Sequence, residues 1–224
     1  MKAVIFDMDG VLVDNLGYNT VAFNELLFKY GVHLDEAYRK KTRGRSLRDQ
    51  IQMWREDFGI KGEIDPLDFS KKALAIQLKL AEENIKPDED LQKLISELKK
   101  NKIKLGVATS STTDRAEILL DLVEVRDKLD VLVTSEDVEK HKPNPEIFLK
   151  AAEKLGVNPD ECVVFEDALN GIQAANAAGM KSIAFLTKYA TKEDFEGLVD
   201  FTIKNFSEID VSKLKSLFEN EYVN

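Results

Sequence analysis

A short apolar segment that ends in two acids constrains the fold of this chain more than any other feature. Ala3-Val4-Ile5-Phe6 is uninterrupted and contains β-branched residues, which is typical of a strand buried on both faces. Asp7 and Asp9 follow, and Gly10 then allows a sharp turn. Packing does not require two carboxylates at the end of a buried strand. Because parallel α/β sheets bind ligands at the carboxyl ends of their strands, this end is predicted to form a site.

The later part of the chain alternates apolar segments with amphipathic ones. Buried strands are predicted at Ala3–Asp7, Ile103–Thr109, Val131–Thr134, Cys162–Glu166 and Ser182–Leu186, with a weaker one at Asp200–Ile203. Helices are predicted at Asp88–Lys100, Thr112–Leu122, Pro145–Leu155, Ala168–Ala178 and Ser207–Phe218. This alternation indicates βαβ units, so the expected fold class is α/β with a mostly parallel sheet.

The connection from Asp7 to Ile103 is longer than a βαβ unit requires by about 70 residues. It contains helical patterns at Tyr18–Tyr30, Ser46–Phe58 and Asp68–Glu83. We therefore expect a helical domain over residues 15–85, inserted into a core of residues 1–14 and 86–224. A domain inserted beside the acids is well placed to act as a lid. Ile51, Trp54 and Phe58 have helical spacing and are expected to form its core.

Charge and cysteine content limit the class of protein. The formal net charge of −9 argues against nucleic acid or anionic membrane as a partner, and no apolar stretch approaches the ~18 residues of a membrane span. Met1-Lys2 leads directly into the first strand, so no signal peptide is expected. The single cysteine, Cys162, is expected to be a buried, inert thiol. We predict a cytoplasmic protein, and nothing demands more than a monomer.

The acids carry the first chemical hypothesis. A carboxylate can attack phosphorus or an electrophilic carbon, and a second carboxyl group nearby can act as general acid and then base. The alternative is that Asp7 and Asp9 belong only to a solvated turn.

Polar residues also follow the later strands. Thr109 and Ser110 end one strand before a helix, where they could bind an anion or simply cap the helix. Lys142 precedes two prolines and could neutralise a phosphate, or it could lie in a solvated basic loop. Glu166 and Asp167 end another buried strand and offer the hard oxygen ligands that Mg²⁺ prefers.

Together these segments resemble the haloacid dehalogenase-like superfamily of phosphohydrolases. Its motifs occur in order as Asp7-x-Asp9-Gly10-Val11-Leu12-x-Asp14, a strand ending at Thr109, Lys142-Pro143-x-Pro145, and Glu166-Asp167-x-x-x-Gly171. The resemblance covers nearly the whole chain and is closest to the β-phosphoglucomutase-like branch, which includes many phosphatases. It implies a Rossmann-like three-layer α/β/α core with an inserted small α-helical cap.

The resemblance also implies roles for the matched residues. Asp7 would become an aspartyl-phosphate, while Asp9 would protonate the leaving oxygen and then activate water. Thr109 and Lys142 would bind the phosphate oxygens. The remaining expected contacts to substrate are Gly10 and Ser110, and the expected metal site, for Mg²⁺, consists of Asp7, the backbone carbonyl of Asp9, Asp167, and Glu166 as a ligand or its neighbour.

The chain departs from the mutases of this branch near the cap. Asn19 stands where they carry a histidine, Ser110-Ser111-Thr112-Thr113 lacks their Lys-Asn pair, and Leu47 occupies the place of their phosphate-binding arginine. A phosphatase for a small phosphorylated metabolite, such as a sugar phosphate, is therefore favoured, with a sugar phosphomutase as the alternative. Since no catalytic position is missing, a non-catalytic metabolite-binding module is disfavoured.

The cap contains a basic segment in an otherwise acidic chain. Arg43, Arg45 and Arg48 could bind a remote anionic group of the substrate. Asn19, also in the cap, is a further expected contact to substrate. Alternatively, these arginines form a solvated helix start paired with acids such as Asp49. We favour the substrate-binding interpretation.

Overall fold

The protein is described by a computed structural model that covers residues 1–42 and 47–219. Contacts within the chain divide it into two compact units. Unit 1 consists of Met1–Asp14 and Lys86–Asn224, and unit 2 consists of Asn15–Ile85. Each unit is considered by itself below.

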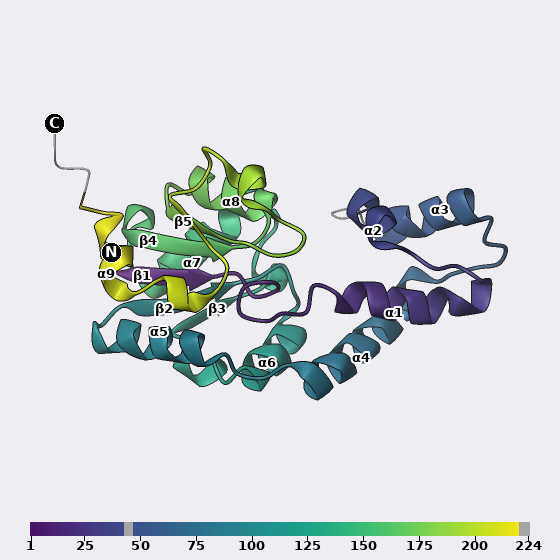
Figure 1. Cartoon of the computed structure of the whole chain (residues 1–224), viewed down its shortest axis with the longest axis horizontal. Helices are drawn as coiled ribbons and strands as arrows, with labels where there is room; N and C mark the ends of the chain where they lie inside the picture. The colour runs from purple at the N-terminus through teal and green to yellow at the C-terminus, as the bar shows by residue number, and fades with distance from the viewer. Residues whose placement is uncertain (43–46, 220–224) are drawn as a thin grey trace. The chain divides into compact units, whose positions relative to one another are not determined.

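The described part of unit 1 contains one parallel sheet of six strands in the order β3-β2-β1-β4-β5-β6. Strands β1 to β5 are labelled in Figure 1. The strands are β1 (Ala3–Phe6), β2 (Lys104–Ala108), β3 (Val131–Val133), β4 (Cys162–Glu166), β5 (Lys181–Phe185) and β6 (Phe201–Ile203). All four residues of β1 are fully buried because β1 lies between β2 and β4. The predicted strands are thus all present.

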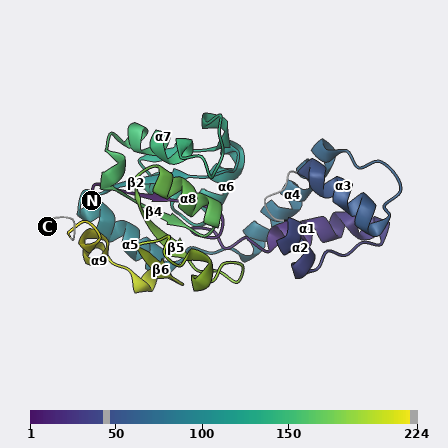
Figure 2. The same ribbon diagram turned by 90° about the horizontal axis from the view of Figure 1, so that it is seen from above.

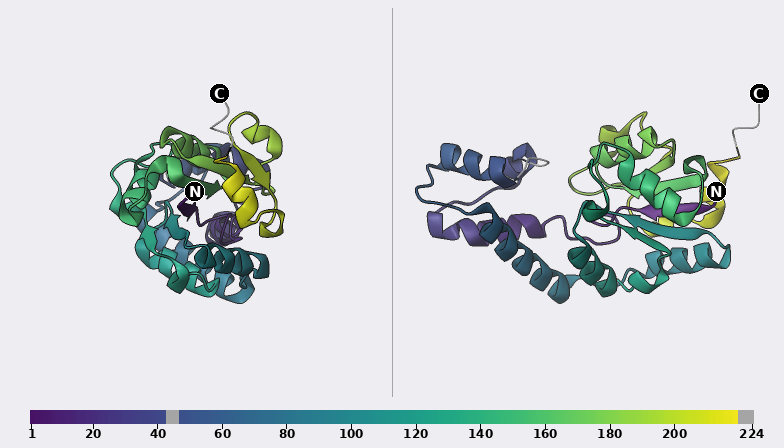
Figure 3. Two further views of the ribbon diagram at one scale, coloured as in Figure 1. Left: turned by 90° about the vertical axis from the view of Figure 1, so that its left-hand side faces the viewer. Right: turned by 180° about the vertical axis from the view of Figure 1, so that it is seen from behind.

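Helices cover both faces of this sheet (Figure 2). They are α5 (Glu89–Lys100), α6 (Thr113–Leu122), α7 (Glu146–Leu155), α8 (Leu169–Ala177) and α9 (Val211–Ser216). Apolar residues of α7 and α8 pack on β1, β2 and β4 in one core cluster, while α5 contacts β2 and α9 on the other side. The layers are also visible from the end of the sheet (Figure 3). The predicted Rossmann-like three-layer α/β/α fold is therefore confirmed.

The C-terminal helix is shorter than predicted. Helix was expected over Ser207–Phe218, but Phe206–Glu208 forms a separate 3-10 turn and α9 begins at Val211. Asp210 between them is extended, and its side chain accepts a hydrogen bond from the backbone N–H of Lys213. A new helix start at Asp210 thus interrupts the predicted helix.

Unit 2 is helical and has its own apolar core. Its helices are α1 (Tyr18–Leu27), α2 (Glu36–Thr42), α3 (Leu47–Phe58) and α4 (Pro66–Asn84). Trp54 is fully buried, with its ring centroid 5.5 Å from that of Phe23 and 5.4 Å from that of Phe69. Helix α2 was not predicted, because its sequence is short and mostly polar.

The predicted core stripe of unit 2 is correct for Ile51 and Trp54 but only partly for Phe58. Phe58 is 39% exposed and packs on Tyr38 of α2, with ring centroids 4.9 Å apart. It therefore lies at the margin of the core. Across both units, no helix in the described ranges is long and apolar enough to cross a membrane.

Candidate active site

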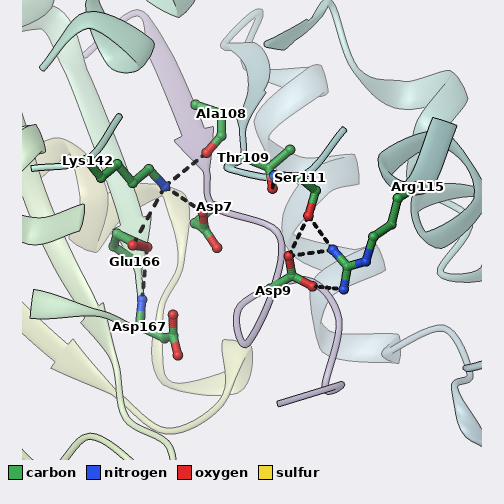
Figure 4. A network of polar contacts seen from close by, with 9 residues as sticks. All are labelled: Asp7, Asp9, Ala108, Thr109, Ser111, Arg115, Lys142, Glu166 and Asp167. Atoms are coloured by element: carbon green, nitrogen blue, oxygen red, sulfur yellow. Dashed lines mark hydrogen bonds and ion pairs between the residues drawn. The ribbon is translucent and has the colours of Figure 1, made fainter. Parts of the chain in front are cut away.

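The first strand delivers Asp7 to the carboxyl edge of the sheet. The backbone N–H of Asp7 donates to the carbonyl of Phe165, which extends the pairing of β1 with β4 by one residue. The Asp7 carboxylate forms an ion pair with Lys142, whose Nζ atom lies 2.6 Å from Oδ1 (Figure 4). Both side chains are almost inaccessible, at 9% and 4% exposed. The predicted strand-end acid and the predicted phosphate-binding lysine are therefore in direct contact in a buried setting.

Lys142 reaches the site from a loop whose backbone is held by the side chain of Glu146. The Glu146 carboxylate at the start of α7 accepts from the N–H groups of Glu139 and Lys140. The ammonium of Lys142 also donates to the carbonyl of Ala108 at 3.2 Å and lies 4.8 Å from the centroid of the Phe148 ring. The hypothesis of a solvated basic loop is wrong for Lys142, because its side chain points into the core.

Three carboxylates gather around this lysine. One oxygen each from Asp7, Glu166 and Asp167 lies within 4.8 Å of the others, and all three residues are buried. Lys142 Nζ is 3.7 Å from Glu166 Oε1. With all groups ionised, the cluster carries three negative charges against one positive charge. Such an arrangement is complementary to a divalent cation.

Burial and the charges of neighbouring groups shift the pKa values of this cluster. Burial raises the pKa of Asp7, although the charge of Lys142 acts in the opposite direction. Burial and the neighbouring charge of Asp7 raise the pKa of Glu166 well above its ordinary value. Burial alone would lower the pKa of Lys142, but the charges of Asp7 and Glu166 outweigh it and raise that pKa. Lys142 therefore remains an ammonium ion.

A glycine makes room for Glu166. A Cβ atom on Gly171, in α8, would lie 1.7 Å from Glu166 Oε1 and 2.1 Å from its carboxyl carbon. Glu166 and Gly171 belong to the same sequence motif, which begins at the end of β4. The Glu166 side chain lies so close to α8 that no side chain fits at position 171, which explains the glycine there.

Asp9 lies on the loop after β1 and has partners of its own. The loop backbone is fixed by Gly10, whose N–H donates to the carbonyl of Val13 at 2.8 Å. The Asp9 carboxylate accepts from both terminal nitrogens of Arg115, at 2.7 and 2.8 Å, and from the Ser111 hydroxyl at 2.9 Å. Figure 4 shows these contacts separate from the group around Asp7.

Arg115 was missed by the sequence analysis. It lies in the first turn of α6, four residues after Ser111, so that both side chains reach the same place. This spacing at the start of a helix that follows a strand-end hydroxyl was the available signal. Burial alone would lower the pKa of Arg115, but the hydrogen bond and charge of Asp9 outweigh it and raise that pKa.

The remaining site residues predicted in unit 1 lie on the segments that follow β1 and β2. Thr109 is 1% exposed and its hydroxyl accepts from the backbone N–H of Ser111 at 3.1 Å. Ser110 is exposed. Thr112 occupies the N-cap position of α6 without a side-chain cap bond, so side-chain capping of the helix at this residue is not observed. Gly10 has a φ of 87°, which the turn after Asp9 requires.

The predicted cap residues belong to unit 2. Arg48 is exposed in the first turn of α3. Asn19 is exposed on α1, and its side-chain oxygen accepts from Nε2 of Gln77 at 2.8 Å. Arg43 and Arg45 lie outside the described residues.

Comparisons with known proteins give consistent matches. The family model described as haloacid dehalogenase-like hydrolase matches residues 4–185. A phosphorylated carbohydrates phosphatase of Thermotoga maritima is 32% identical over 183 residues, covering 82% of this chain and 84% of that protein. Fructose-1-phosphate phosphatase YqaB of Escherichia coli is 34% identical over 183 residues, with coverages of 80% and 94%. The crystal structure of β-phosphoglucomutase from Clostridium difficile has a TM-score of 0.81 and 26% identity, and each chain is fully covered.

Proposed function

Because the chain belongs to the haloacid dehalogenase-like hydrolase family, we propose that it is a Mg²⁺-dependent phosphatase that acts through an aspartyl-phosphate on Asp7. The family membership and the phosphatases among its relatives confirm the predictions of family and of a phosphatase-type enzyme. The metal, the covalent intermediate and the residue roles are proposed. The observation that supports them most is the buried contact between the Asp7 carboxylate and the Lys142 ammonium.

The donor set fits a magnesium ion. Asp7, Glu166 and Asp167 offer carboxylate oxygens from the ends of two adjacent strands, and Lys142 balances only one of their charges. We propose Asp7 and Asp167 as ligands, with the backbone carbonyl of Asp9, and Glu166 as a ligand or the neighbour that orients one. The ion would supply positive charge to the phosphate oxygens.

The proposed reaction has two displacement steps at phosphorus, and Asp7 and Asp9 take part in both. In the first, an Asp7 oxygen forms a bond to phosphorus while the ester P–O bond breaks, and the leaving oxygen takes a proton from Asp9. In the second, water attacks phosphorus, its proton goes to Asp9, and the bond to Asp7 breaks. Lys142 and Thr109 would hold the phosphate oxygens, with Ser110 and Gly10 bordering the same edge.

The substrate class rests on the relatives. Two phosphatases with more than 30% identity act, by name, on phosphorylated carbohydrates or fructose 1-phosphate. We propose a sugar phosphate or a similar small phosphorylated metabolite. Unit 2 is proposed to be the cap that selects it, through residues including Arg48, Asn19, Arg43 and Arg45. A cytoplasmic monomer remains a prediction.

The test is a panel of sugar phosphates and other phosphate esters, assayed for inorganic phosphate with Mg²⁺ and with EDTA. We expect hydrolysis that requires Mg²⁺ and that falls at least about 10³-fold in Asp7→Asn. Asp160→Asn, an exposed acid in unit 1, is the matched control and should keep full activity. Wild-type turnover in Asp7→Asn would exclude this nucleophile.

The same panel distinguishes the mutase alternative. A phosphomutase would interconvert glucose 1-phosphate and glucose 6-phosphate when primed with a sugar bisphosphate, with little release of inorganic phosphate. We expect release of phosphate without interconversion.

A further inference from the structure

Arg115 holds Asp9 with a two-pronged contact that links distant parts of unit 1. Its Nη2 and Nη1 atoms donate to Oδ1 and Oδ2 of Asp9 at 2.7 and 2.8 Å, and the two residues are 106 positions apart. The Arg115 side chain is 16% exposed and that of Asp9 is 29% exposed. A paired contact of this kind fixes the plane of a carboxylate as well as its position.

A third donor completes the arrangement. The Ser111 hydroxyl donates to Oδ2 of Asp9, and Arg115 Nη1 also contacts that hydroxyl. Ser111 is itself held by Thr109, whose hydroxyl accepts from its backbone N–H. The loop after β1 is fixed by its backbone bonds, whereas these side-chain donors fix the direction of the carboxyl group of Asp9.

We propose that Arg115, assisted by Ser111, is the positioning residue that aims the Asp9 carboxyl group at the oxygen to which it delivers a proton. The inference rests on the proposed role of Asp9 as acid and base. Arg115 would act through Asp9 and not on the substrate. Its guanidinium contacts both oxygens of this carboxylate. Aligned proton transfer contributes about 10²–10⁴-fold to a reaction that needs it.

The consequence depends on the leaving group. A sugar alkoxide is a poor leaving group and must be protonated as the ester bond breaks, whereas p-nitrophenolate leaves as a stable anion. Misdirection of Asp9 should therefore slow phosphorylation of Asp7 by a sugar phosphate but not by p-nitrophenyl phosphate. Water activation in the second step is common to both substrates, so that step should slow equally.

The experiment measures the two steps separately by rapid quench and by the burst of p-nitrophenol, in wild type and Arg115→Met, with Mg²⁺. The substrates are p-nitrophenyl phosphate and the sugar phosphate that the wild type hydrolyses best. We expect phosphorylation by the sugar phosphate to fall about 10²-fold, and phosphorylation by the aryl ester to fall less than about 3-fold. The affinity for either substrate should not change.

Three further variants complete the test. Arg115→Lys keeps the charge without the two-pronged geometry and should restore only part of the loss. Ser111→Ala removes one donor, should lower the sugar phosphate step about 3–10-fold, and provides the measurement if Arg115→Met does not fold. Arg126→Met removes a half-exposed arginine paired with Glu117 and should behave as wild type.

The outcomes separate this inference from the proposed function. Equal slowing of phosphorylation by both substrates would mean that Arg115 acts on the phosphoryl group, and faster turnover would mean that it restrains Asp9; either result overturns the inference, as does no change. If the wild type hydrolyses neither substrate, the proposed function itself fails.

Discussion

The Nζ atom of Lys142 lies 2.6 Å from Oδ1 of Asp7, although the two residues are 135 positions apart in the sequence. The contact is buried and neighbours two further carboxylates, so its charges are weakly screened by solvent. Removal of any one of these charges should therefore change the free energy of unfolding more than removal of a charge from a surface ion pair does.

Replacement of Lys142 by methionine should destabilise the protein and stop catalysis. The change leaves the acids around Asp7 and Glu166 without their buried counter-charge, so we expect the free energy of unfolding to fall by about 3–5 kcal/mol in EDTA. Activity should fall at least about 10²-fold. Urea unfolding and phosphate release measure the two effects. Lys140→Met, two residues away and exposed, should change neither.

Replacement of Glu166 by glutamine should stabilise the metal-free protein. The pKa of Glu166 is raised well above its ordinary value of 4.5, so its carboxylate opposes folding increasingly as the pH rises above that value. At pH 7.5 in EDTA we expect a gain of about 1 kcal/mol or more, equivalent to a Tm increase of about 2–4 °C. The difference should vanish near pH 4, where the unfolded chain also carries the proton.

The same Glu166→Gln variant should respond less to Mg²⁺. Titration with Mg²⁺ should raise the Tm of the wild type and raise that of the variant by a smaller amount, because one negative charge is lost from the cluster. Glu139→Gln is the exposed control, and it should match the wild type in both tests. A variant less stable than wild type in EDTA would contradict the inferred repulsion.

Substitution of alanine for Gly171 should disturb the proposed metal site by displacing the side chain of Glu166. The new Cβ would overlap the Glu166 carboxyl group, which must then move. We expect the affinity for Mg²⁺, read from the metal dependence of activity, to fall about 10–100-fold. Asn170→Ala adjoins it in α8 and is exposed, so it tests for a general effect of substitution in this helix. Unchanged metal affinity in Gly171→Ala would show that Glu166 does not support the site.

The Cys162 thiol should be unreactive in the native protein. Burial raises the pKa of Cys162 to about 12, so the thiolate is scarce at pH 8 and the sulfur atom is inaccessible. We expect Ellman's reagent to modify the native chain at least about 10²-fold more slowly than the urea-unfolded chain. This would confirm the sequence prediction of an inert thiol by its chemistry. Rapid labelling of native protein at pH 8 would contradict it.

Much of the fold could be predicted because its signals are local. A strand buried on both faces needs an unbroken apolar segment, and β1 and β4 have one. The lengths of the intervening helices then indicate a parallel sheet, and the strand ends fall at the same edge. Predictions were wrong where local patterns compete, as at Asp210, which begins a new helix inside a continuous amphipathic pattern.

The candidate site was predictable in composition and less so in geometry. Asp7, Lys142, Glu166 and Asp167 were expected from their motifs, and the structure brings these side chains together at one edge of the sheet. The partners of Asp9 were not expected, since Arg115 belongs to no motif quoted from the sequence.

The sequence by itself determined which residues end the strands, because a strand buried on both faces requires an unbroken apolar segment and the end of that segment is visible locally. Only the tertiary structure decided which charges meet. Arg115 reaches Asp9 because β1 and β2 are adjacent in register and α6 begins just beyond β2. Such a pairing depends on packing between segments about a hundred residues apart. The spacing of Ser111 and Arg115 could have drawn attention to Arg115, but no local pattern identifies Asp9 as its partner.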